Sequence, residues 1–183
     1  MGEYSRVYKT DLTDRQLMQF WGLAQAEGRS RSVSYCLPPQ DGEGFCRWMR
    51  KEDIHPWIIL FREQPCGLFF LTDMQGKAAQ CHFCTLPMGT QRTEGRLPVA
   101  RGAGLFALGA ALWEETETSY RLDTLIGVTP VCNKHAVKYV QSLGGRVCGV
   151  VPGMCWYYDT NENVPGLVTV FDRTTVPESA AGI

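Results

Sequence analysis

The sequence has almost no net charge, because 18 lysine and arginine residues nearly balance 19 aspartate and glutamate residues and leave a formal net charge of −1. A protein that binds nucleic acid through its phosphates normally carries a basic surplus, so we expect no nucleic-acid partner. A hydrophobic fraction of 44% and a charged fraction of 20% argue against disorder. Together they indicate one globular domain over residues 1–183.

Long apolar runs are also missing. No segment approaches the roughly 20 consecutive apolar residues of a membrane span. Residues 1–6 lack the apolar region of a secretory signal peptide. We therefore expect a cytoplasmic protein with no membrane partner.

A full set of metal ligands is missing as well. The closest pair among eight cysteines, Cys81 and Cys84, has no second Cys-x-x-Cys and no histidine pair to complete a zinc site. Their segment alternates like a strand, which would point the two side chains to opposite faces. Without a secretory signal, reduced thiols packed as small hydrophobic residues are the better interpretation. We expect no bound metal.

What is present is a regular order of strands and helices. Residues 1–56 predict an N-terminal strand and two helices, residues 57–128 a sheet and a helix, residues 129–172 a late helix and a terminal hairpin, and residues 173–183 a tail that frays after 177. The individual elements are strands at 4–10, 57–61, 67–72, 78–85, 122–128, 147–151, 155–158 and 167–171, and helices at 14–27, 45–49, 101–119 and 133–143. A right-handed crossover through helix 101–119 would set strands 78–85 and 122–128 parallel. The long loop at 87–100 is a functional candidate.

Two motifs stand at helix starts in this order. Arg101-Gly102-Ala103-Gly104-Leu105-Phe106 opens the helix after the three-strand meander, and Asn133-Lys134-His135-Ala136 opens a later helix that ends at Leu143-Gly144-Gly145. With the element order, they resemble the GNAT superfamily of acyl-CoA-dependent N-acyltransferases, over residues 4–171. The resemblance implies an α/β (α+β) fold with a mixed, mostly antiparallel central sheet, two early helices, one helix after the phosphate loop, one late helix and splayed central strands.

The resemblance also implies a coenzyme. A helix N-terminus offers unpaired N–H groups and the positive end of a dipole to a pyrophosphate, so Arg101, Gly102, Ala103, Gly104, Leu105 and Phe106 are expected to bind acetyl-CoA or another acyl-CoA. Asn133 would lie beside the pantetheine. Phe106 departs from the small residue that ends the family's pattern.

The implied reaction is direct attack by an amine on the thioester, in the gap between strands 78–85 and 122–128. The acceptor would be a small-molecule or peptide amine. A backbone N–H at Thr85 or Leu86 would hold the oxyanion. Tyr139 is the candidate acid, although the family's tyrosine position is occupied by Val140.

The candidate base is His82, on the strand before the gap, because an imidazole can take a proton from an amine. It would serve only if it faces the gap and not the layer of early helices. Glu94, in the long loop, is a second candidate.

Two hypotheses in which the protein is not an enzyme remain open. Val140 and Phe106 favour a GNAT-like domain that senses acyl-CoA or binds another protein. Exposed aromatics at Trp156, Tyr157 and Tyr158 favour a partner subunit, including a homodimer.

Overall fold

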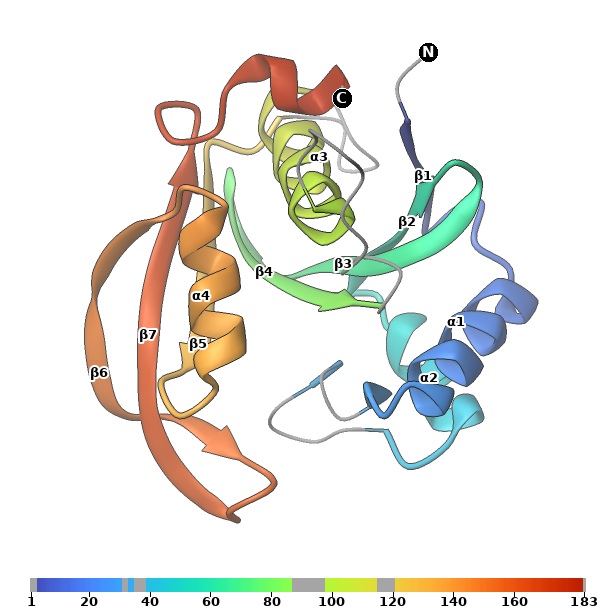
Figure 1. The fold of residues 1–183 in the computed structure, drawn as a ribbon, viewed down its shortest axis with the longest axis horizontal. Coiled ribbons are helices and arrows are strands. Elements are labelled where there is room, and N and C mark those ends of the chain that lie inside the picture. Colours follow the sequence, from blue (N-terminus) through green and yellow to red (C-terminus); the bar gives the residue numbers. More distant parts are fainter. Residues whose placement is uncertain (1–2, 31–32, 35–38, 87–97, 115–120, 183) are drawn as a thin grey trace.

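The computed structural model of the chain describes residues 3–30, 33–34, 39–86, 98–114 and 121–182. Within them the elements are β1 (Tyr4–Tyr8), α1 (Asp14–Ala26), α2 (Gly42–Met49), β2 (His55–Phe61), β3 (Gln64–Gln75), β4 (Ala78–Thr85), α3 (Val99–Trp113), β5 (Thr124–Pro130), α4 (Lys134–Ser142), β6 (Arg146–Tyr157), β7 (Glu162–Asp172) and the short 3₁₀ helix η3 (Glu178–Gly182). Figure 1 shows this arrangement. The expected mixed α/β fold is confirmed.

All seven strands belong to one sheet, in the order β1-β2-β3-β4-β5-β7-β6. Every neighbouring pair is antiparallel except β4 and β5, which are parallel. That exception is the pair the crossover through α3 predicts. The two central strands, β4 and β5, therefore lie side by side and run in the same direction.

Local side-chain chemistry fixes the starts of α1, α2 and α4. Thr13 caps α1 in a capping box with Gln16, Asp41 caps α2 by accepting from the N–H of Gly44, and Asn133 caps α4 by accepting from the N–H of Ala136. Each cap satisfies backbone donors that a helix start leaves without partners.

Two hydrophobic layers cover opposite faces of the sheet. The α1/α2 layer joins those helices to alternate residues of the strands, including Ile58, Leu68, Phe70 and Cys84. The α3/α4 layer takes the residues in between, including Ile59, Phe69, Leu71 and Cys81, and most of α3. Alternation along β4 thus sends Cys81 and Cys84 to different layers, as expected.

Three expectations about the ends of elements are wrong. Helix α3 ends at Trp113, because Glu114 is extended, and not near residue 119, which lies outside the described residues. The two pieces expected at 147–151 and 155–158 are one strand, β6, with register shifts between Val147 and Gly149 and between Val151 and Cys155. The tail does not fray: Ala180 in η3 is 4% exposed, because Gly109 of α3 leaves room for the backbone of Ala180 and Ala181.

No helix in the described ranges is both long and apolar enough to cross a membrane.

Candidate functional site

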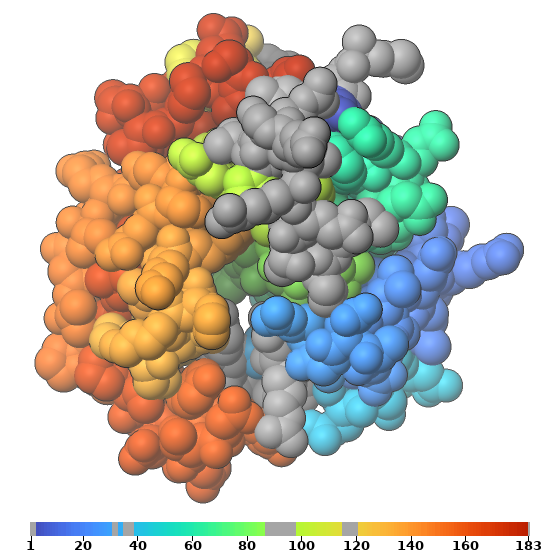
Figure 2. Space-filling view, in the orientation of Figure 1, coloured from blue at the N-terminus to red at the C-terminus, as the bar shows by residue number. Residues whose placement is uncertain are grey.

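The centre of the sheet opens into a gap. Strands β4 and β5 pair only from Ala78 to Gln80, against Thr124 to Ile126. Beyond those three pairs the strands diverge, and a cavity of about 440 Å³ lies between them. Figure 2 shows the hollow between the C-terminal elements and the N-terminal helices. The expected splay is confirmed.

The cavity reaches both faces of the sheet. On the α1/α2 side it is lined by Val33, Ser34, Trp48, Lys51, Asp53, Ile54, Phe70, Thr72, Asp73, Gln80 and His82. On the other side it is lined by Phe83, Ala136, Tyr139, Val140 and Phe171, and β5 and β6 contribute Gly127, Val128, Thr129, Met154 and Cys155. Two molecules could therefore enter from opposite faces and meet in the gap.

Backbone N–H groups of β4 point into the gap. The N–H of Leu86, directly after β4, donates to Cys66 O of β3 at 3.0 Å. The carbonyl of Lys77, directly before β4, accepts from the N–H groups of Asp123 and Thr124 at the start of β5. Because successive residues of a strand direct their N–H groups to opposite sides, Phe83 and Thr85 direct theirs towards β5, past the point where pairing stops. Leu86 as an oxyanion donor is therefore wrong, since its N–H is used in the sheet. Phe83, which the sequence did not single out, joins Thr85 as a candidate donor.

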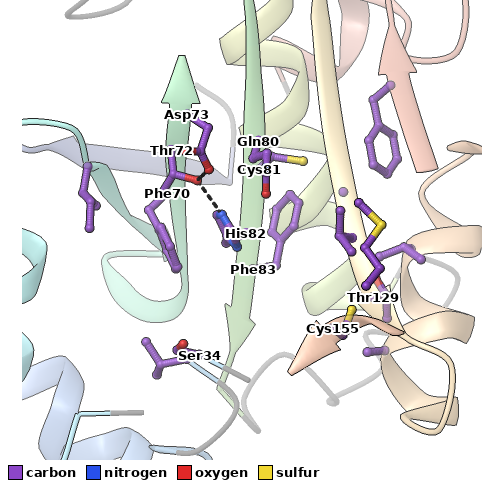
Figure 3. A pocket seen from close by; sticks show the side chains of 18 of the residues that line it. Ser34, Phe70, Thr72, Asp73, Gln80, Cys81, His82, Phe83, Thr129 and Cys155 are labelled. Atoms are coloured by element: carbon purple, nitrogen blue, oxygen red, sulfur yellow. Dashed lines mark hydrogen bonds between the residues drawn. The ribbon is translucent and has the colours of Figure 1, made fainter. Parts of the chain in front are cut away.

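His82 lies on the α1/α2 side of β4 and lines the cavity (Figure 3). Its ring stacks on Phe70, with centroids 4.5 Å apart and planes 8° apart, and its Nε2 lies 2.9 Å from the hydroxyl of Thr72. Burial lowers the pKa of His82 from 6.5 to about 4, against an opposing effect of Asp73. The imidazole is therefore neutral at physiological pH with a lone pair that can accept a proton, and burial makes it a weaker base than an exposed imidazole. The sequence criterion for a base excluded the side of the early helices, and His82 lies on that side, as Cys84 does. It stays a candidate because the cavity extends through the gap to the α1/α2 face and the imidazole lines it there.

Thr72 and Asp73 join His82 in a chain of hydrogen bonds that sequence reasoning missed. The Thr72 hydroxyl donates to Asp73 Oδ2 at 3.1 Å. In a regular strand these neighbours would face opposite sides, but β3 shifts register between Thr72 and Gln75 and Asp73 has a φ of 49°. The only signal in the sequence is an Asp near a turn, a residue type that tolerates this conformation.

Tyr139 lines the cavity, but its hydroxyl is already hydrogen-bonded to α3. Its hydroxyl donates to Ala100 O at 2.9 Å, and its ring packs edge-on against Phe83. Burial, with smaller effects from Cys66 and Tyr4, raises the pKa of this hydroxyl far above its ordinary value. Val140, at the family's tyrosine position, is 8% exposed and also lines the cavity.

The expected phosphate loop is the first two turns of α3. The N–H groups of Arg101 and Gly102 already bond to Pro98 O, and from Ala103 onward the N–H groups lie inside the helix. The N–H groups of Val99 and Ala100 are those that a helix start leaves available. The expectation that residues 101–106 present their N–H groups to a ligand is therefore wrong. The available N–H groups lie earlier in the helix, at Val99 and Ala100.

Both glycines of this motif admit tyrosine side chains. A Cβ on Gly102 would overlap the hydroxyl of Tyr4, and a Cβ on Gly104 would overlap that of Tyr139. Those hydroxyls donate to the carbonyls of Val99 and Ala100 in the same turn. Their packing role explains the Gly-x-Gly pattern without a ligand.

The remaining residues of the motif divide between core and surface. Ala103 and Phe106 are buried in the α3/α4 layer, with Leu105 partly buried beside them. The Arg101 side chain donates from Nε to Ser142 O, at the end of α4, at 2.8 Å. Glu94, the second candidate base, lies outside the described residues.

The cysteines next to His82 are not activated. Burial raises the pKa of the Cys81 and Cys84 thiols to about 12, so both are protonated and packed. Among the residues that the structure describes, no three His, Cys, Asp or Glu side chains gather as a metal site would require.

Comparisons with solved structures place this architecture in a class. The chain superimposes on Mycobacterium smegmatis RimJ in complex with CoA-disulfide with a TM-score of 0.70, 14% identity and coverage of 93% and 84% of the two chains. Against Vibrio cholerae spermidine N-acetyltransferase in complex with CoA and spermine the TM-score is 0.69, with 13% identity and coverage of 95% and 98%. Against Vibrio fischeri ribosomal-protein-S5-alanine acetyltransferase the TM-score is 0.67, with 8% identity and 96% coverage of both chains.

The chain therefore has the fold of the GNAT acetyltransferases. No family model matches the sequence, and no curated protein sequence matches it. At 8–14% identity it is a divergent example of this fold.

Proposed function

We propose that the chain is an N-acyltransferase that moves an acetyl or other acyl group from acyl-CoA to the amine of a small molecule or peptide. The observation that carries the proposal is the cavity through the gap between β4 and β5, open to both layers. Such a passage lets a thioester and an amine approach the same strand edge from opposite faces. Holding both reactants in line supplies a large part of the rate.

On the α3/α4 side, the first turn of α3 would bind the pyrophosphate of the coenzyme. Val99 and Ala100 supply the N–H groups there, and the helix dipole adds favourable electrostatics. Arg101 lies in the same turn, and Asn133 at the start of α4 remains the candidate neighbour of the pantetheine. The glycines shape this turn through Tyr4 and Tyr139 and would act on the coenzyme only indirectly.

In the gap, the neutral amine attacks the thioester carbonyl. The N–C bond forms as the C–S bond breaks, and the oxyanion is held by the N–H of Thr85 or Phe83. His82 takes the proton that the amine nitrogen loses. CoA leaves as the thiolate and takes a proton from solvent, because the hydroxyl hydrogen of Tyr139 is already bonded to Ala100 O. Tyr139 thus positions α4 against α3.

A charge at Ala100 tests the coenzyme site. An Asp in the first turn suits the helix dipole, so Ala100→Asp is expected to fold with unchanged or slightly higher stability. The same charge repels a pyrophosphate, and acetyl-CoA affinity by calorimetry should fall at least about tenfold, or 1.4 kcal/mol. Ala100→Asn is the matched neutral control and should bind like the wild type. Equal affinity in all three proteins would place the coenzyme elsewhere.

A second candidate function is an acyl-CoA-sensing or protein-interaction module without turnover. It is favoured by Val140 at the usual position of the acid and by the engaged hydroxyl of Tyr139. Release of CoA thiol, measured across polyamines, amino acids, aminoglycosides and peptides, separates the two functions. Turnover with any amine supports the enzyme. Acetyl-CoA binding without turnover across the whole panel supports the module.

A further inference from the structure

The hydrogen bonds around His82 fix which of its ring nitrogens carries the proton. A carboxylate has no proton to give, so the 3.1 Å hydrogen bond between Thr72 and Asp73 requires the Thr72 hydroxyl to donate to Asp73. A hydroxyl has one hydrogen. The contact of 2.9 Å between Thr72 and His82 Nε2 must therefore have Nε2–H as donor and the hydroxyl oxygen as acceptor. That leaves Nδ1 with its lone pair, as the hydrogen-bond acceptor of the ring.

The backbone of β3 is distorted where this chain of hydrogen bonds is built. Asp73 adopts a left-handed φ of 49°, and the ladder with β4 loses register between Thr72 and Gln75. Such bulges re-aim side chains next to functional sites, and strained conformations persist where the surroundings support them. Here the distortion turns Asp73 to the side of the sheet that Thr72 and His82 share. Figure 3 shows the three side chains together at the edge of the cavity.

We propose that Thr72 and Asp73 are positioning residues that hold His82 as its Nε2–H tautomer and orient Nδ1 as the proton acceptor of the cavity. The catalytic use of this tautomer rests on the proposed function. As the N–C bond forms and the C–S bond breaks, Nδ1 takes the proton from the amine. The carboxylate of Asp73 stabilises the resulting imidazolium through Thr72. The imidazolium then returns the proton to solvent as the thiolate gains one.

Replacing Asp73 with Asn should reverse the tautomer. Asn fits the same backbone conformation, but its NH₂ group can donate to the Thr72 oxygen. The Thr72 hydroxyl is then free to donate to Nε2, which moves the imidazole proton to Nδ1. An Asp→Asn change beside a catalytic histidine of a serine protease acts through the wrong tautomer in the same way.

Long-range ¹H–¹⁵N NMR of the imidazole rings measures the tautomer directly and needs no substrate. The chain has three histidines, so His82→Gln assigns the signal. The wild type should show Nε2–H at neutral pH, and Asp73→Asn should shift the population towards Nδ1–H. Asp53→Asn is the matched control, because Asp53 also lines the cavity but is not bonded to Thr72, and it should leave the tautomer unchanged. A wild-type ring protonated at Nδ1, or an Asp73→Asn spectrum like that of the wild type, would overturn the inference.

The hydroxyl of Thr72 gives a second test. Thr72→Val removes the link with little change in shape, whereas Thr72→Ser keeps it. In the valine variant the tautomer of His82 should no longer depend on residue 73, so the long-range ¹H–¹⁵N spectra of Thr72→Val with and without Asp73→Asn should show the same tautomer. The other titratable groups that line the cavity, and that stay in place in these variants, are Lys51, Asp53, Cys81, Tyr139 and Cys155. A serine variant that behaves like the valine variant would refute a role for the hydroxyl.

Kinetics tests the catalytic use separately from the tautomer. If an acceptor amine is found, Asp73→Asn should lower kcat by about 10- to 100-fold with little change in KM, since a positioned base contributes about 10²–10⁴-fold. Thr72→Ser should restore most of the activity that Thr72→Val loses. A reversed tautomer with unchanged kcat would keep the hydrogen-bond assignment and remove His82 from the reaction. Absence of any turnover would refute the proposed function and leave the NMR result to decide the tautomer.

Discussion

Substitution of Gly104 tests whether the Gly-x-Gly motif serves packing. A Cβ at this position would overlap the hydroxyl of Tyr139 and lie 2.8 and 3.0 Å from the methyl groups of Leu143, well inside the 3.5–4.0 Å of a normal carbon contact. Overpacking of this kind costs about 1–3 kcal/mol, and displacing Tyr139 breaks a hydrogen bond worth about 1 kcal/mol. Ala recovers about 1 kcal/mol of helix propensity over Gly. Gly104→Ala should therefore lower the free energy of unfolding by about 2 kcal/mol.

A double-mutant cycle isolates the contact with Tyr139. Tyr139→Phe alone loses the hydrogen bond to Ala100 O, about 1 kcal/mol, but removes the oxygen that the new Cβ meets. In that background the Cβ still meets the Leu143 methyl groups, and the helix propensity gained by Ala roughly offsets that remaining overlap. Gly104→Ala should then cost close to nothing, which gives a coupling of about 2 kcal/mol between the two sites. Urea unfolding followed by tryptophan fluorescence measures all four proteins.

Gly22 is the matched control for this cycle. It lies in α1, and nothing is within 4 Å of the position of its Cβ, so Gly22→Ala should raise stability by up to about 1 kcal/mol. If Gly104→Ala stabilises the protein as Gly22→Ala does, or costs the same with and without the Tyr139 hydroxyl, the packing explanation is refuted. If it holds, loss of CoA binding in a Gly104 variant is not evidence for a phosphate contact.

Two further predictions concern the gap and the edge of the sheet. Thr85→Pro removes an N–H that faces the gap and takes no part in the ladder with β3, so it should lower kcat by about 10²–10³-fold if this group holds the oxyanion. Thr85→Val is the control, because it keeps the N–H. Equal kcat values for the two variants would point to the N–H of Phe83. Strand β6 ends the sheet with Val150 53% and Met154 46% exposed, so light scattering should detect a homodimer that Val150→Lys dissociates. A wild type that stays monomeric at high concentration would contradict the second prediction.

The order of elements was predictable because each signal is local. Cap residues such as Thr13 and Asn133 mark helix starts through bonds to N–H groups three residues away. Alternation along β4 separates Cys81 from Cys84 with no knowledge of the rest of the chain. The crossover rule then makes β4 and β5 parallel. These steps place β4 beside β5, and the resemblance to the GNAT superfamily supplied the expectation that the two strands splay into a gap.

The details of the site depend on contacts between segments far apart in sequence. Gly104 meets Tyr139 of α4, and Gly102 meets Tyr4 of β1, so a motif typical of phosphate binding can be required by packing alone. The N–H direction of Leu86 depends on its register with Cys66, which periodicity does not give. Asp73 reaches Thr72 only because β3 bulges. A sequence pattern of period two contains no sign of such a bulge.

The acid sensitivity of the fold follows from the buried His82. Its pKa is about 4 in the folded protein, against the ordinary value of 6.5, so between these values the unfolded chain binds more protons and stability falls as the pH falls. From pH 7.5 to pH 5 the loss from this one group is about 2 kcal/mol. His82→Gln has no such group, so urea unfolding at the two pH values should show a smaller loss by that amount. His135→Gln, on the exposed side of α4, is the control and should lose as much stability as the wild type. An equal acid loss in His82→Gln would show that the imidazole is not held neutral in the cavity, and the base assigned to it would have to be sought among other groups.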